Sequence, residues 1–242
     1  MDHCCPIVEL RQYTLHPEKR DVLIELFDRE FLESQDALGM KVIGQFRDLG
    51  DPSRFVWLRG FQDMASRKEG LTAFYDGPVW KEHRAAANAT MIDADNVLLL
   101  HPARSGSGFL LRGDRPRLGA KEGGGGLVIA TIYYLDANAG GGFADFFDRT
   151  LRPALSASGA SVEATFATEH SPNNYPKLHV REGENVFVSF SVFPDQVAYD
   201  RHLTAIARDS RWTEITKELA RRIKGQPEVL KLSPTSRSHL RG

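Results

Sequence analysis

Residues 8–15 read VELRQYTL and residues 128–135 read VIATIYYL, and these segments open two copies of one pattern. With a shift of 120 positions, ten residues between 8 and 46 recur in the second copy. With a shift of 132, thirteen residues between 55 and 102 recur. These 23 identities in 87 aligned positions are several-fold more than random residue usage gives. A duplicated unit of about one hundred residues therefore sets the architecture.

Each copy predicts the order strand, helix, strand, strand, helix, strand. Gly39 and Gly159 are expected to end the first helix of each copy, since glycine is favoured just past a helix C-terminus. The expected strands are 8–15, 41–48, 54–61 and 97–100 in the first copy and 127–135, 161–168, 185–193 and 229–232 in the second. This order is typical of the ferredoxin-like unit, an antiparallel sheet with helices on one face.

The predicted fold class is α+β, with two tandem ferredoxin-like (βαββαβ) domains packed as an internal α/β barrel. We expect the first domain over residues 6–111 and the second over 127–236. Residues 112–126 end in four glycines and predict a flexible linker. The second copy also carries a polar insertion, residues 168–183, which is open to interpretation as a lid, a dimer contact or a surface excursion.

Charge and hydropathy exclude several classes of protein. The 31 Lys and Arg residues balance 32 Asp and Glu residues, which argues against a nucleic-acid partner. No apolar run approaches the roughly 18 residues that span a bilayer, so no membrane partner is expected. The N-terminus shows no signal region, and a cytoplasmic protein is the expectation.

Strand residues alternate between the two faces of a sheet. The even positions are mostly apolar, and we expect them to meet the helices. The odd positions mix charged and aromatic residues, and we expect them to line the barrel interior. The odd positions of the first copy include Glu9, Arg11, Tyr13, Trp57 and Arg59, whereas the second copy has Ile129, Thr131, Tyr133, Ser189 and Ser191.

The first copy therefore supplies the charge of any pocket. Its excess of arginine suits a carboxylate, enolate or phosphate, because the guanidinium group forms paired hydrogen bonds with such anions. The predicted ligand-binding residues are Arg11, Arg47, Trp57, Arg59 and Trp80. The alternative is that these residues form structural ion pairs and packing rings at a seam between the domains.

Chemistry without a cofactor needs one base and one hydrogen-bond donor near the substrate. The candidate catalytic residues are Glu9, Tyr13 and His83, although a lone helical histidine is more often a surface residue. No helix pairs two histidines or a glutamate and a histidine at ligand spacing, so we expect no metal site and no cofactor.

The segments VELRQYTL (8–15), FVWLRGF (55–61) and GPVWKEHR (77–84) resemble the NIPSNAP family of the dimeric α/β-barrel superfamily. The second-copy segment SPNNYPKL (171–178) is similar to two-domain bacterial members. The resemblance implies ferredoxin-like domains with facing sheets. It implies no established reaction or catalytic residue set, although superfamily relatives include cofactor-independent oxygenases and isomerases.

The sequence thus predicts a NIPSNAP-like protein of undefined activity. We expect a small anionic or aromatic metabolite to bind in the barrel interior, with oxygenase or isomerase chemistry as one outcome. The alternative is a non-enzymatic interaction protein with a solid barrel core. A homo-oligomer is also expected.

Overall fold

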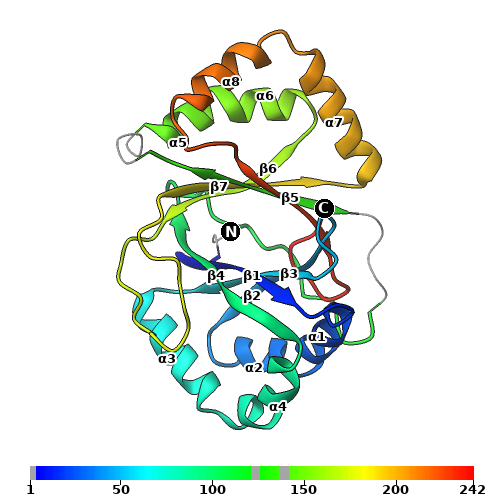
Figure 1. Cartoon of the computed structure of the whole chain (residues 1–242), viewed down its shortest axis with the longest axis vertical. Coiled ribbons are helices and arrows are strands. Elements are labelled where there is room, and N and C mark those ends of the chain that lie inside the picture. Colours follow the sequence, from blue (N-terminus) through cyan, green and yellow to red (C-terminus); the bar gives the residue numbers. More distant parts are fainter. Residues whose placement is uncertain (1–3, 121–125, 137–141) are drawn as a thin grey trace.

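A computed structural model describes residues 4–120, 126–136 and 142–242 (Figure 1). The strands of the first half are β1 (Ile7–Leu15), β2 (Lys41–Asp48), β3 (Arg54–Phe61) and β4 (Met91–Pro102), and its helices are α1 (Arg20–Leu26), α2 (Leu32–Asp36), α3 (Met64–Tyr75) and α4 (Pro78–Asn88). The strands of the second half are β5 (Leu127–Tyr134), β6 (Ser161–Thr168), β7 (Val186–Phe193) and β8 (Glu228–Pro234), and its helices are α5 (Phe143–Phe146), α6 (Arg152–Ala157), α7 (Gln196–Arg208) and α8 (Trp212–Ala220). The predicted ferredoxin-like order is confirmed in both halves.

The eight strands close into one antiparallel barrel in the order β1-β3-β2-β8-β5-β7-β6-β4. Each half contributes four neighbouring strands, and the halves meet along two short seams. At one seam β2 pairs with β8, and at the other β4 pairs with β6. The helices of the two halves lie at opposite ends of the molecule, outside the barrel (Figure 1). The predicted internal α/β barrel is confirmed.

Local sequence explains where the helices begin and end. The side chains of Asp63 and Asp195 accept hydrogen bonds from the backbone N–H groups of Ser66 and Ala198, so both cap the helix that follows. Gly39 ends its helix at a φ of +75°, a conformation that favours glycine. In both halves the long first helix contains a π-helical turn, η1 (Phe27–Phe31) and η2 (Phe147–Leu151). Among the described residues, no helix has the length and apolar character required to span a membrane.

The expected assignment of the two sheet faces is wrong. The even-numbered side chains, such as Leu10, Leu58, Val128 and Phe190, point into the barrel and form one apolar cluster shared by both halves. The odd-numbered side chains of the first half pack against its helices instead. The physical reason is that the two mostly apolar faces bury each other, while the helices themselves supply aromatic and polar partners for the mixed face.

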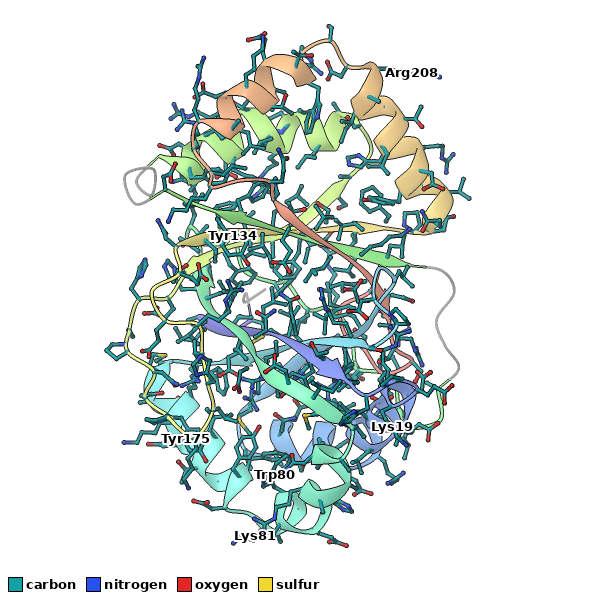
Figure 2. The ribbon with its side chains drawn as sticks, in the orientation of Figure 1. Lys19, Trp80, Lys81, Tyr134, Tyr175 and Arg208 are labelled. Atoms are coloured by element: carbon teal, nitrogen blue, oxygen red, sulfur yellow. A yellow bond between two sulfur atoms is a disulfide. The ribbon has the colours of Figure 1, made fainter. Side chains whose placement is uncertain are left out.

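The insertion of the second half reaches the first half. We call residues 169–185 the strap and residues 173–178 its tip. The strap leaves the end of β6, runs beside β4 and reaches α3, which belongs to the other half (Figure 1). Figure 2 shows Tyr175 of the tip next to α3. Tyr175 and Val180 are buried in the helix-side core of the first half.

Candidate functional site

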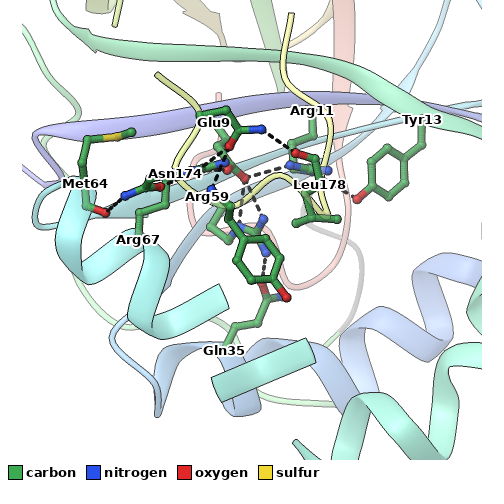
Figure 3. A network of polar contacts seen from close by, with 11 residues as sticks. Glu9, Arg11, Tyr13, Gln35, Arg59, Met64, Arg67, Asn174 and Leu178 are labelled. Carbon is green, nitrogen blue, oxygen red and sulfur yellow. Dashed lines mark hydrogen bonds and ion pairs between the residues drawn. The ribbon is translucent and has the colours of Figure 1, made fainter. Parts of the chain in front are cut away.

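A buried carboxylate gathers three arginines between the sheet and helices of the first half (Figure 3). Glu9 Oε2 accepts from Arg11 Nη1 at 2.9 Å and from Arg59 Nη2 at 2.7 Å. Glu9 Oε1 accepts from Arg67 Nε at 2.8 Å. All four side chains are at most 1% exposed. Glu9 and Arg59 face each other across the β1–β3 pair, and Arg67 comes from α3.

The network carries more positive than negative charge, because one carboxylate faces three guanidinium groups. Burial alone would raise the pKa of Glu9, but Arg59, Arg11 and Arg67 outweigh burial and hold that pKa well below its ordinary value. Burial opposes the charge of Arg11, yet Tyr13 and Glu9 raise the pKa of Arg11 above its ordinary value. Glu9 and Arg11 are therefore both ionised at neutral pH.

Polar neighbours satisfy most of the remaining donors of the arginines. Arg11 Nε donates to the Tyr13 hydroxyl at 3.1 Å. Arg59 Nη1 donates to Gln35 Oε1 at 2.9 Å. Arg67 Nη1 donates to the amide oxygens of Asn173 at 3.1 Å and Asn174 at 2.8 Å, which both belong to the strap. Arg67 Nη2 is buried without a partner.

A small cavity of about 30 Å³ lies beside this network. Its wall is aromatic, with a polar edge that includes the amide of Gln35. The other lining residues are Tyr13, Leu23, Phe27, Phe31, Trp57, Phe74, Tyr75, Trp80, Ala87 and Met91. The indole Nε1 of Trp57 is buried and has no hydrogen-bond partner. A buried donor without a partner is costly, and this one belongs to a residue of the cavity wall.

Trp57 is held in place by charged and aromatic groups. The guanidinium carbons of Arg59 and Arg11 lie 4.9 and 5.5 Å from the centre of its ring. The rings of Tyr13 and Phe27 pack edge-on against it, with centroids at 5.9 and 4.8 Å. These contacts fix the indole against the sheet, so Nε1 is presented in one orientation.

The structure brings together five of the predicted site residues: Glu9, Arg11, Tyr13, Trp57 and Arg59. They meet on the helix side of the sheet and not in the barrel interior, which corrects the expected location. Trp80 also lines this cavity.

Two predicted site residues lie apart from the cavity. Arg47 pairs with Asp21 at 2.8 Å on the outer part of β2. His83 pairs with Glu30 at 3.4 Å and is not part of the cavity wall. Neither residue belongs to the charge network around Glu9, and their binding and catalytic roles stay predictions.

Three parts of the site were not predicted from the sequence: Arg67, Gln35 and the asparagines of the strap that accept from Arg67. Arg67 shares a helix face with Leu71 and Phe74 at helical spacing, and all three are buried. Gln35 continues the spacing of Phe27 and Phe31. A polar residue at an otherwise apolar helix position was the available signal. No cluster of three or more metal-ligating side chains occurs among the residues that the structure describes.

Comparison with known proteins fits this architecture. Residues 8–105 match the model of the NIPSNAP family. The match lies in the first half, and the second half repeats the order of strands and helices of the first. No curated protein matches the sequence.

Solved structures share the two-unit fold along nearly the whole chain. A candidate monooxygenase from Lactobacillus acidophilus covers 95% of this chain and 94% of its own, with 14% identity and a TM-score of 0.58. A candidate monooxygenase from Fusobacterium nucleatum covers 97% and 94%, with 10% identity and a TM-score of 0.59. An anthrone oxidase-like protein covers 95% and 91%, with 12% identity and a TM-score of 0.53. At these identities the likeness concerns the fold.

Proposed function

We propose that the helix-side cavity of the NIPSNAP domain binds a small aromatic molecule that carries an anionic oxygen, such as an enolate, phenolate or carboxylate. The observation that carries this proposal is the unpaired Nε1 of buried Trp57, a residue that lines an aromatic-walled cavity and packs against Arg11 and Arg59 of the charge network.

Electrostatics favours an anion at this position. The excess positive charge is buried, where water screens it weakly, so an oxygen anion near Trp57 gains from both the indole N–H and the nearby guanidinium groups. The aromatic wall favours a planar apolar body. Together these features select an acidic aromatic molecule over a sugar or a cation.

The same geometry suits a reaction through an enolate. Glu9 is a poor base, because three arginines occupy its carboxylate and hold its pKa low. Tyr13 accepts a hydrogen bond from Arg11, which leaves its own O–H to donate to a substrate oxygen. Stabilisation of an enolate is the step that cofactor-independent oxygenation requires of the protein. Because none of these residues acts as a base, anthrone has to lose its proton to solvent and enter as the enolate; its overall oxidation consumes one O₂ and yields anthraquinone and water.

The binding test uses 2-naphthoate as the probe in isothermal titration calorimetry. Trp57→Phe and Arg11→Met are each expected to weaken binding at least tenfold, while Trp212→Phe in the second half leaves it unchanged. Oxygen uptake with anthrone then tests the reaction. Equal affinity in Trp57→Phe and the wild type would overturn the proposed site.

The barrel supports a second candidate function. Its interior holds a large cluster of apolar side chains from both halves. A protein of this kind serves as a rigid scaffold, whose outer surface binds a macromolecular partner. A NIPSNAP domain that binds no aromatic anion, yet purifies with one stoichiometric protein partner, would favour this function.

A further inference from the structure

The size of the cavity poses a mechanical problem for the proposed function, on which this inference rests. A volume of about 30 Å³ accommodates roughly two water molecules and no aromatic ring. Ligand entry therefore requires part of the wall to move. The strap is a candidate for this movement, because Tyr175 in its tip stacks on Tyr75 of the cavity wall with ring centroids at 6.0 Å.

The two arms of the strap are fixed to β4 by backbone hydrogen bonds. The N–H of Glu169 donates to the carbonyl of Leu99 at 2.8 Å, and the N–H of Arg181 donates to the carbonyl of Val97 at 2.9 Å. These bonds place both arms of the strap alongside β4, next to the point where β4 pairs with β6. They hold both ends of the strap while its middle part is free to respond to other contacts.

The tip is held differently, by side chains. Asn174 Nδ2 donates to the carbonyl of Met64 at 2.5 Å, and its Oδ1 accepts from Arg67 Nη1 at 2.8 Å. Lys177 lies 3.4 Å from Asp76 in an exposed ion pair, which contributes little. The tip is thus held by side-chain bonds of Asn173 and Asn174 and by burial of the Tyr175 ring.

The closed position also leaves polar atoms unsatisfied. The Tyr175 hydroxyl and Arg67 Nη2 are both buried at the contact of strap and α3, and neither has a hydrogen-bond partner. Opening exposes both atoms to water, which offsets part of the loss of the Asn174 bonds. Opening also exposes the buried ring of Tyr175, so the open position of the tip is a minor state, and the two unsatisfied atoms lower its cost.

We propose that the strap is a movable cover, through which the second half controls access to the site of the first half. The tip lifts from α3 while the arms stay on β4. Tyr75 then loses its stacking partner and keeps its edge contacts with Phe74 and Trp80, so a shift of Tyr75 together with these rings enlarges the cavity. When the ligand is bound, the tip returns and seals it from water.

NMR relaxation dispersion on the full chain tests the motion without any ligand. Backbone amides of the tip and of the first turn of α3 are expected to show exchange, while those of Glu169 and Arg181 do not. Asn174→Ala is expected to raise the open population about tenfold, because it removes both bonds of Asn174. Flat profiles at the tip in the wild type and in Asn174→Ala would overturn the cover.

Stopped-flow association of 2-naphthoate tests the link to binding. If the ligand enters only the open form, Asn174→Ala binds about tenfold faster than the wild type. Tyr175→Phe, which removes the unpaired hydroxyl and stabilises the closed form, binds about fivefold slower. His179→Ala, an exposed change in the strap, is the matched control and leaves the rate unaltered.

The two proposals fail in different ways. Equal association rates in Asn174→Ala and His179→Ala, with binding intact, would overturn the cover and leave the binding site standing. Absence of binding in every variant, with exchange still present at the tip, would overturn the proposed function and leave a moving strap.

Discussion

Tyr13 and Tyr133 occupy the same position in the two halves, but their surroundings differ. The Tyr133 hydroxyl lies beside the hydroxyls of Ser189 and Thr131, and burial raises its pKa to about 12. The Tyr13 hydroxyl accepts from the guanidinium group of Arg11, with Trp57 packed edge-on against its ring. One fold therefore surrounds the same phenol with neutral hydroxyls in one half and with charge in the other.

The comparison separates what the fold requires from what the first half adds. The π-helical turn, the capping aspartates and the aromatic packing recur in both halves, so they belong to the fold. The cluster of Arg11, Arg59 and Arg67 around Glu9 and the unpaired indole N–H of Trp57 belong to the first half. A buried charge network costs desolvation energy without improving packing, so this difference supports the proposed binding role.

The largest effect is expected when the charge network loses its carboxylate. Glu9→Gln leaves three buried arginines without a counter-charge, and we expect urea unfolding to show a loss of about 3 to 5 kcal/mol. The combined change Glu9→Leu, Arg11→Met, Arg59→Met and Arg67→Met makes this region apolar, like the second half, and should restore most of the stability. A loss below about 1 kcal/mol in Glu9→Gln would show that the network is not electrostatically coupled.

The Glu9 carboxylate is also expected to make the free energy of unfolding depend on pH in acid. The native pKa of Glu9 lies below its unfolded value, so in acid the unfolded chain binds a proton that the native protein does not. Stability contributed by Glu9 is present above its ordinary pKa of about 4.5 and falls by about 1.4 kcal/mol per pH unit below it. Unfolding measured from pH 5 to pH 3 should show this extra slope in the wild type and not in the combined apolar variant.

A smaller and opposite effect is expected at the paired positions Asp28 and Asp148. Burial raises the pKa of Asp28 to about 6, so the native protein holds a proton that the unfolded chain releases, and stability falls as pH rises from about 4 to 6. At pH 8 Asp28→Asn should therefore stabilise the protein by about 1 to 2 kcal/mol, after allowance for solvent screening. Asp148 pairs with Arg152 at 2.9 Å near the surface, so Asp148→Asn should give no gain. A gain in both variants would contradict the assignment.

The smallest expected effect concerns the two tyrosines themselves. Tyr133→Phe removes a hydroxyl that has only neutral neighbours, and thermal unfolding should show a loss of about 1 kcal/mol. Tyr13→Phe leaves a buried donor of Arg11 unpaired and should cost about 1 kcal/mol more. Equal losses would mean that Arg11 finds another acceptor.

The repeat made the fold predictable from the sequence. Identities such as Gly39 with Gly159 fix corresponding helix ends, and they aligned the strands well enough to predict the order of elements. Alternation also separated the charged side chains from the apolar ones correctly. Alternation does not show which face of each sheet meets the helices and which face meets the other sheet, because both faces are buried here.

The location of the site was therefore mispredicted, although five of its residues were named. The helices were expected to cover the apolar face of each sheet. Phe27 and Phe31 with Gln35, and Arg67 in α3, show that the helices bring aromatic and polar groups of their own. The strap contacts between Asn174, Arg67 and Met64 join residues more than one hundred positions apart, and no local pattern reports such contacts.

Because both halves belong to one chain, assembly of the barrel does not depend on protein concentration. The seams that close the barrel pair only three residues each, Phe46–Asp48 with Leu232–Pro234 and Leu100–Pro102 with Phe166–Thr168. Two separate polypeptides held by such seams and the shared apolar core would dissociate at low concentration, whereas tethered halves meet at a constant effective concentration. The number of assembled sites per molecule is therefore the same in a crowded cell and in a nanomolar assay.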